Sequence, residues 1–288
     1  MNVRSIIVWW VRLVWAALAV AAAPAWGDAL ASSSSAVQAT AAAGAWLVWG
    51  VALVAAAALS TVSLTVARLA MTVAVPAQIT VAIHTPGGWA VAAVALSVAA
   101  AVAVMSAEFA QACVQASAYG AEERYPLRPP APFVAPMAIA WSVLAAAWIT
   151  GPLSLAAGSW IPGIALSAVA VTATVVLGRR FHRMARRWMV LVPAGVVVHD
   201  PLLLAETVMV RRNELVGVRL ASDTASALDL TGLTWGAAVQ IDAREPQPVV
   251  TRGGGQDGGP KAQRAQAILV APSRPGLVLS AVRRARLA

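Results

Sequence analysis

The chain has 288 residues, of which 60% are hydrophobic and only 11% are charged. Because soluble domains carry roughly 25% charged residues, this composition argues against one large soluble domain and for a membrane protein. One cysteine, Cys113, and three scattered histidines exclude a disulfide framework and argue against a metal centre, so we expect no cofactor.

Residues 1–178 are predicted to form a transmembrane helical domain. It opens with Ile6–Ala23, an apolar run interrupted by Arg12, which we favour as a retained first helix. A signal peptide and a membrane-surface helix remain open as alternatives for it. Residues 28–44 form a Ser/Ala-rich loop without basic residues, and Ala45–Leu64 is long and apolar enough to span.

Val66–Ile83 is ambiguous, because this apolar stretch contains Arg68, Pro76 and several threonines. It is consistent with a full span, a re-entrant segment or an interfacial helix. Turn-forming residues follow at 84–88, and Trp89–Val114 is the next predicted span. Depending on Val66–Ile83 and on the first run, we expect four to six spans.

The second half of Trp89–Val114 carries an acid, Glu108, which shares one helix face with Gln111 and Gln115. An ionisable residue within a span is a functional candidate, and Arg68 and Gln111 are candidate partners for Glu108. The simpler interpretation, which we favour, is that Glu108 lies near the inner interface and is hydrated.

Residues 121–130 contain two arginines and three prolines and are interpreted as a cytoplasmic loop. Met137–Leu153 and Trp160–Leu177 then form a pair of spans. The turn between them is predicted from Gly151-Pro152 and from Ile161-Pro162-Gly163, and it lacks Lys and Arg, as expected for the outer face.

Residues 179–187 form a basic juxtamembrane segment directly after the last apolar run. Arginines are retained on the cytoplasmic side of a membrane, so this segment predicts a multi-pass plasma-membrane protein with a cytoplasmic C-terminus. The same arginines are candidate ligands for anionic lipid, each contributing about 1 kcal/mol near a charged surface, although a topology signal alone would look the same. They are Arg179, Arg180, Arg183, Arg186 and Arg187.

From Arg179 to the C-terminus the chain has 16 basic and 8 acidic residues, which accounts for nearly all of the net charge of +9. Nucleic acid and anionic lipid both bind basic surfaces. Because these charges follow a membrane boundary, we favour membrane lipid and expect no nucleic-acid partner.

Residues 188–288 are predicted to form a small β-rich domain. Ser273 is a candidate cap for a final helix opened by Pro275, and short strands followed by one helix suggest a barrel or half-barrel plugged by that helix. The glycine-rich run 253–260 lacks the Gly-Lys-Ser/Thr ending of a phosphate-binding loop and is read as a flexible loop. The candidate strands are Trp188–Val192, Val196–Val198, Glu206–Arg212, Leu215–Leu220, Ala227–Leu230, Ala237–Asp242, Pro248–Arg252 and Ala267–Val270.

Trp188–Asp200, Glu206–Leu220 and Ala267–Arg284 together resemble a bacterial pleckstrin-homology-like (PH-like) domain. The resemblance covers residues 186–286, and membrane-tethered members of this family place the domain directly after transmembrane helices. The stretch 186–200 is also similar to actinobacterial integral membrane proteins. The resemblance implies a binding or scaffolding module without fixed catalytic residues.

We therefore expect a non-enzymatic scaffold or accessory protein whose PH-like domain binds a protein partner or anionic lipid. The alternative is a small transporter or permease component. Arg68, Glu108 and the Pro/Gly-interrupted segments favour it, whereas the lack of a visible sequence repeat argues against it. An intramembrane enzyme would need an acid/base or metal constellation that the spans do not show. Abundant small residues in the spans are compatible with a homo-oligomer.

The predicted topology is tested by fusing reporters to the C-terminus. Alkaline phosphatase placed there should be inactive and a cytoplasm-active fluorescent protein should be bright, because the basic segment 179–187 is expected to stay inside. High phosphatase activity would contradict the orientation of every span.

Overall fold

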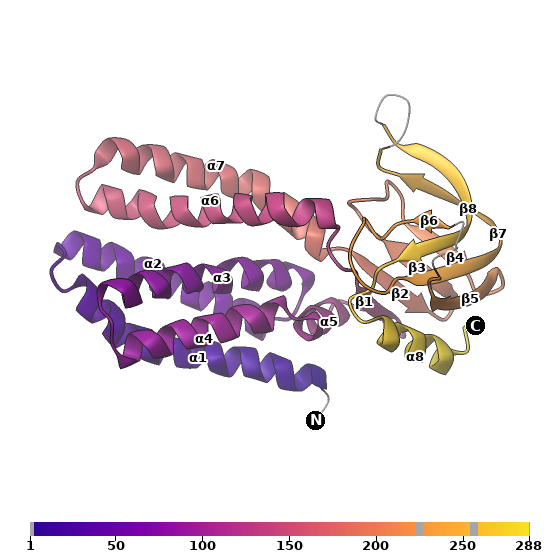
Figure 1. Ribbon diagram of the computed structural model, residues 1–288, viewed down its shortest axis with the longest axis horizontal. Helices are drawn as coiled ribbons and strands as arrows, with labels where there is room; N and C mark the ends of the chain where they lie inside the picture. Colours follow the sequence, from indigo (N-terminus) through magenta and orange to yellow (C-terminus); the bar gives the residue numbers. More distant parts are fainter. Residues whose placement is uncertain (1–2, 223–226, 254–258, 288) are drawn as a thin grey trace. The chain divides into compact units, whose positions relative to one another are not determined.

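A computed structural model describes residues 3–222, 227–253 and 259–287 of the chain (Figure 1). The chain divides into two compact units. One comprises Met1–Cys113 and Ala138–Phe181, and the other comprises Val114–Met137 and His182–Ala288. The segment Val114–Met137 therefore belongs to the C-terminal unit, although the sequence placed it within the helical domain of residues 1–178.

Seven helices precede the main β-rich region. Within the described residues, six of them are long and apolar enough to cross a membrane, and the exception is the short helix α5. This number agrees with the upper limit of the four to six expected spans. The helices are α1 (Val3–Leu30), α2 (Ser35–Ala57), α3 (Thr61–His84), α4 (Gly88–Met105), α5 (Ala107–Gln115), α6 (Ala131–Ala156) and α7 (Trp160–Ala185).

The ambiguous stretch Val66–Ile83 lies within one continuous helix, α3, which passes through Pro76. Serine caps decide where α2 and α3 begin. Ser34 accepts a hydrogen bond from Val37 N at 3.4 Å, so α2 starts at Ser35 and the predicted loop 28–44 is largely wrong. Ser60 caps α3 in the same way, accepting from Ser63 N at 3.0 Å, so the predicted span Ala45–Leu64 is split.

The predicted span Trp89–Val114 is also interrupted. Helix α4 ends at Met105, and Ser106 caps the following helix by accepting from Phe109 N at 3.2 Å. The turn between α6 and α7 consists of residues 157–159, so the Gly-Pro motifs proposed for it lie inside the helices instead. Proline is tolerated in the first turn of a helix, which explains Pro162 in α7.

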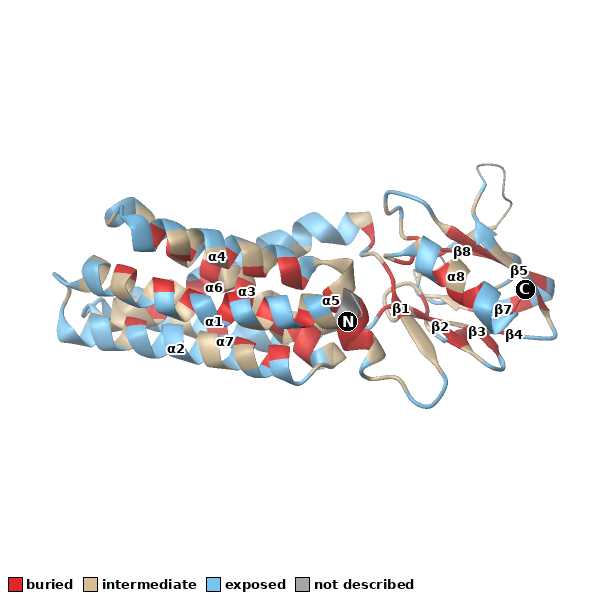
Figure 2. Cartoon of the chain, turned by 90° about the horizontal axis from the view of Figure 1, so that it is seen from below, coloured by how far each residue is buried: buried red, intermediate tan, exposed pale blue. Residues whose placement is uncertain are grey.

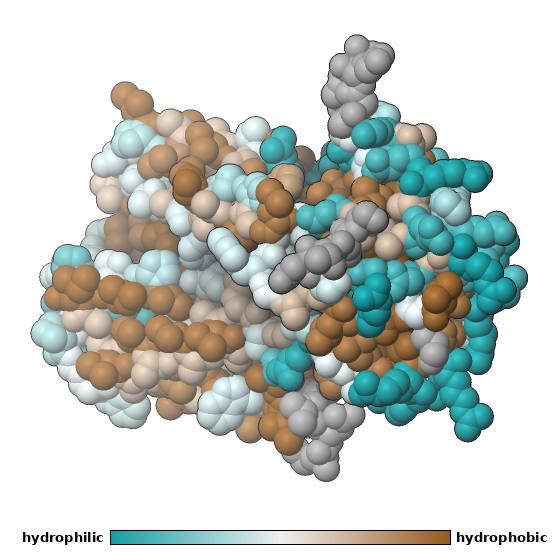
Figure 3. Space-filling model, turned by 45° about the vertical axis from the view of Figure 1, so that its right-hand side comes forward, coloured by the Kyte–Doolittle hydropathy of each residue, from teal (hydrophilic) through white to brown (hydrophobic). Residues whose placement is uncertain are grey.

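The helices pack through small side chains. In α4, Ala93, Ser97, Ala100 and Ala103 are buried at helical spacing. Between α6 and α7, a Cβ added at Gly151 would lie 2.8 Å from Ser167 Oγ, which shows how closely the two backbones approach. Small residues permit this close packing in membrane helices. Large apolar side chains instead remain on the exposed helix faces, which are pale blue in Figure 2 and brown in Figure 3.

The described residues of the C-terminal unit form two four-stranded sheets, with strand orders β1-β2-β3-β4 and β5-β7-β8-β6. All described pairs are antiparallel except β6 with β8. Figure 3 shows hydrophilic side chains gathered on this unit. The strands are β1 (Glu123–Pro126), β2 (Trp188–Val192), β3 (Gly195–His199), β4 (Val208–Arg211), β5 (Leu215–Leu220), β6 (Leu228–Asp229), β7 (Val239–Thr251) and β8 (Lys261–Val270).

One apolar core lies between the two sheets and helix α8 (Pro275–Ala285). Met189 and Val196 enter it from the first sheet, Ile241 and Ile268 from the second, and Val278 from α8. The helix presents Val278, Ala281 and Val282 to this core, as its i, i+3, i+4 spacing predicts. The described part of the unit thus consists of two sheets and a C-terminal helix, and its strands do not close into the barrel that the sequence suggested.

Three features of this unit differ from the sequence prediction. The loop 121–130 contributes β1, whose residue Tyr125 pairs with Met189 of β2. The two strands expected at Ala237–Asp242 and Pro248–Arg252 are one long strand, β7, with an irregularity between Asp242 and Gln247. Pro275 opens α8 as predicted, but the described helix has no side-chain cap and Ser273 N instead donates to Pro126 O at 2.8 Å. Residues 254–258 of the predicted flexible loop lie outside the described residues.

Candidate functional site

Two arginines in the helical unit satisfy the ends of neighbouring helices. Arg12 Nε and Nη2 of α1 donate to the carbonyls of Ala56 and Ala57, at 3.0 and 3.1 Å, where α2 ends. Arg68 Nε of α3 donates to Val104 O at 3.1 Å, where α4 ends. The last carbonyls of a helix have no intrahelical donor, so both guanidiniums act as caps. This contact gives Arg68 a structural role. From the sequence, Arg68 was considered as a partner of Glu108, but its Nε donates to Val104 O instead.

Glu108 lies in the first turn of α5, outside the six membrane-length helices. Its side chain is half-buried. A carboxylate in the first turn of a helix is favoured by the helix dipole. Glu108 therefore lies on the short helix that follows α4, and its interpretation as a hydrated residue near the inner interface stays a prediction.

The five candidate lipid-binding arginines do not behave alike. Arg179, Arg180 and Arg183 are exposed on the last two turns of α7, and Arg186 is exposed just after the helix ends. Arg187, by contrast, is only 1% exposed. The structure therefore removes Arg187 from the lipid-facing set and leaves four exposed guanidiniums beyond the apolar part of α7.

Arg187 is buried because it forms an ion pair with Asp200 inside the C-terminal unit. Arg187 Nε lies 2.8 Å from Asp200 Oδ1, and Nη2 lies 2.6 Å from Oδ2. Arg187 Nη1 also donates to the carbonyl of Arg128, and the amides of Leu202 and Leu203 donate to Asp200 Oδ1. This bidentate geometry, together with the backbone hydrogen bonds, satisfies the donors and acceptors of a charged pair that would otherwise be costly to bury.

A second cluster lies on the opposite face of the first sheet. The imidazole of His199 stacks on the indole of Trp188, with ring centroids 5.0 Å apart. The guanidinium carbon of Arg124 lies 5.4 Å from the Trp188 ring, and Arg124 also pairs with Glu122 at 2.6 Å. His199 Nδ1 lies 3.1 Å from Thr207 Oγ1. Burial lowers the pKa of His199, and the charges of Arg186 and Arg124 lower it further against the opposing effect of Asp200.

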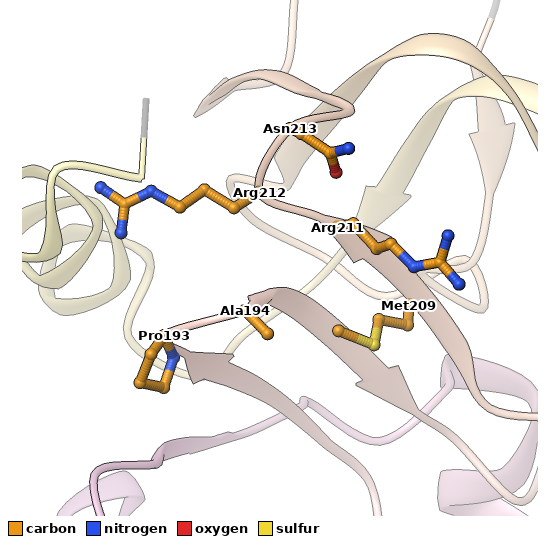
Figure 4. A pocket seen from close by; sticks show the side chains of 6 residues that line it. All are labelled: Pro193, Ala194, Met209, Arg211, Arg212 and Asn213. Carbon is orange, nitrogen blue, oxygen red and sulfur yellow. The ribbon is translucent and has the colours of Figure 1, made fainter.

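A hollow of about 660 Å³ on this unit lies beside the β2–β3 turn and the end of β4. It is lined by Pro193, Ala194, Met209, Arg211, Arg212 and Asn213. Figure 4 shows that Arg211 and Arg212 point to opposite sides, as neighbouring residues at a strand end do. Arg212 Nη2 donates to Arg286 O at 3.0 Å, and Arg211 Nη1 lies 3.8 Å from Glu214 Oε1. The two guanidiniums therefore do not converge on one anion.

Within the part of the chain that the structure describes, no group of three His, Cys, Asp or Glu side chains is placed to hold a metal ion. Comparisons of this chain with models of protein families, with curated proteins and with solved structures found no match.

Sequence reasoning did not find the Arg187–Asp200 pair, the Arg124–Trp188–His199 stack or the capping role of Arg12. The ion pair joins the residue before β2 to the residue after β3, and Arg187 was interpreted from the sequence as a lipid ligand. One signal was available, because Trp188 begins one strand and His199 ends the next, so both lie at the open end of the hairpin. In the observed register Trp188 and His199 are directly opposite each other.

Replacing Asp200 by Ala should destabilise the C-terminal unit strongly, because Arg187 would keep a buried charge without its partner. We expect a loss of about 3–5 kcal/mol in the free energy of unfolding, measured by chemical denaturation of the purified protein. Glu214→Ala removes the exposed pair with Arg211 and is the matched control, with an expected loss of at most about 1 kcal/mol. Equal losses would contradict the stated role of the buried pair.

The environment of His199 makes stability depend on pH. The folded state disfavours the charged imidazole, so the pKa of His199 is lower in the folded chain than in the unfolded chain. The contribution of neutral His199 to the free energy of unfolding is therefore fully present above the unfolded pKa of about 6.5, and it declines as pH falls below that value. His199→Phe keeps a ring against Trp188 but cannot titrate, so its melting temperature should fall less between neutral pH and mild acid than that of the parent. His84→Gln, at an exposed position, is the control. An unchanged pH dependence in His199→Phe would exclude this origin.

Proposed function

We propose that this protein is a non-enzymatic, multi-pass membrane scaffold that presents a cytoplasmic β-rich module and gathers anionic lipid around the end of α7. The proposal rests above all on one observation, the four exposed arginines that follow the apolar part of α7. A cytoplasmic leaflet containing anionic lipid attracts each such residue by about 1 kcal/mol.

The composition of α7 supports this arrangement. Its apolar part, Trp160–Leu177, would be about 27 Å long at 1.5 Å per residue, close to the hydrocarbon thickness of a bilayer. Arg179, Arg180 and Arg183 then lie at headgroup depth, where their aliphatic stems can follow the apolar surface while the guanidiniums reach the phosphates.

The buried pair of Arg187 and Asp200 supports the scaffold role. It fixes the residue directly after Arg186 in the core of the C-terminal unit. The order of two sheets and a final helix is also compatible with the PH-like resemblance. Such a module binds through its surface and needs no catalytic residues.

The transporter alternative loses its strongest support in this proposal. Arg68 was its main intramembrane charge, and the guanidinium is used to cap α4. Glu108 lies on α5 rather than within a membrane-length helix.

The proposal is tested by comparing spin-labelled phosphatidylglycerol with spin-labelled phosphatidylcholine as boundary lipids of the reconstituted full chain. The parent should select phosphatidylglycerol several-fold, and added salt should reduce the preference because charges near the surface are screened. A variant with Arg179, Arg180, Arg183 and Arg186 replaced by Gln should lose most of this preference.

The matched control removes four other exposed basic side chains, with Gln at Arg244, Lys261, Arg264 and Arg283. It changes the net charge by the same amount and should keep the lipid preference. Equal association of both lipids with the parent, or an equal loss in both variants, would contradict a specific role for the end of α7.

A further inference from the structure

The loop between β6 and β7 displays two large apolar side chains outside the core. Leu233 is 71% exposed and Trp235 is 79% exposed. The residues at the two ends of this loop, Leu230 and Val239, are buried in the core at 2% and 0% exposure. A loop fixed at both ends therefore directs its largest apolar groups outward, a pattern typical of interaction surfaces.

The shape of the loop is held by Arg128. Its Nη1 donates to the carbonyl of Trp235 and its Nη2 to the carbonyl of Ala237, while Arg128 N donates to Ala271 O at 2.8 Å. Gly236 has a φ of +91°, and a Cβ there would lie 2.3 Å from Arg128 Nη1. The guanidinium thus donates to the Trp235 and Ala237 carbonyls, as the amides of a neighbouring strand would do in a sheet.

The backbone at Leu233 is also unusual, because its φ is +58°, in the left-handed region that side chains other than Gly rarely adopt. Such conformations persist where the surrounding structure enforces them, and they cluster at binding sites. Here Gly232, with a φ of +69°, approaches Pro130 so closely that a Cβ would lie 2.6 Å from Pro130 Cβ.

This contact places the loop beside the start of α6. Ala131 N, at the first residue of α6, donates to Gly232 O at 3.1 Å. Both partners belong to the same compact unit, which includes Val114–Met137. Helix α6 is one of the six membrane-length helices, and its first turns already expose Phe133 and Val134.

We propose that residues 230–239 form a membrane-interface loop whose Leu233 and Trp235 insert into the lipid leaflet at which α6 begins. Tryptophan is enriched at this depth because its ring is apolar while its N–H can reach polar groups. Amphipathic helices at the interface bury their apolar side chains about 5–10 Å deep in the headgroup and acyl boundary, and we expect a similar depth for this loop. The inference rests on the proposed function only in requiring that α6 crosses the membrane.

A lipid bilayer, rather than a protein, is favoured as the partner by two observations. The loop that carries the exposed pair is hydrogen-bonded to the first residue of a helix that is apolar and long enough to cross a membrane. In addition, residues 230–239 contain no charged residue that would have to be desolvated on insertion.

The test places an environment-sensitive fluorophore on single cysteines in the full chain, reconstituted in phosphatidylcholine vesicles. The variants are Leu233→Cys and Trp235→Cys. Val216→Cys on β5 is the matched control, since Val216 is also apolar and is 61% exposed. The unsubstituted chain is labelled in parallel to measure any reaction of Cys113, which is buried.

Probes at 233 and 235 should be quenched several-fold more than the probe at 216 by nitroxide lipids labelled near the headgroup, and less by a water-soluble quencher. If they match the probe at 216 in both measurements, the loop faces water and the proposal is wrong. Protection from both quenchers would indicate a protein contact and would equally overturn it. If one variant fails to fold, the other decides.

The lipid in this experiment is zwitterionic, so the result does not depend on attraction between the arginines of α7 and anionic lipid. Immersion of the loop together with no preference for phosphatidylglycerol would refute only the lipid-gathering role. The reverse pair of results would refute only the loop.

Discussion

The pair formed by Arg187 and Asp200 is the interaction on which the C-terminal unit depends. It joins the start of β2 to the end of β3 and also holds the carbonyl of Arg128, which follows β1. Both charges are buried, so removal of either side chain would leave the other as an uncompensated charge in the apolar interior. The position of three segments is therefore coupled to one guanidinium.

This coupling explains why the basic segment has two parts with different tasks. Arg186 is exposed and Arg187 is buried, so the change from a surface to a core position occurs between adjacent residues. A strand begins at Trp188, where alternate side chains turn to opposite faces. The exposed arginines therefore stop at Arg186, and the folded C-terminal unit continues from Arg187 into β2.

Elsewhere the chain uses arginine to satisfy carbonyls that regular structure leaves without donors. Arg12 and Arg68 do so at the ends of α2 and α4, and Arg128 does so in the loop before β7. The planar guanidinium suits this task because it carries five donors and stays charged. In both helical contacts, an arginine of one helix donates to a carbonyl at the end of the next helix in the chain.

The sequence by itself determined the membrane-length helices, the β-rich character of residues 188–288 and most strand positions. These depend on local composition and on the spacing of apolar residues, which neighbouring positions reveal. It also predicted that the final helix opens at Pro275. Helix boundaries were less accurate at Ser34, Ser60 and Ser106, because a serine among many alanines is a weak local signal for a cap.

Only the tertiary structure decided that Arg187 is buried, that residues 123–126 form a strand and that Trp235 is displayed on a constrained loop. Each outcome depends on a partner far away in the chain: β1 needs β2, and the loop needs Arg128. Local sequence records which side chains are available for such contacts. The packing of the two sheets and α8 around one core decides which of these side chains meet. Buried polar groups need hydrogen-bond partners, and here those partners lie far away in the sequence.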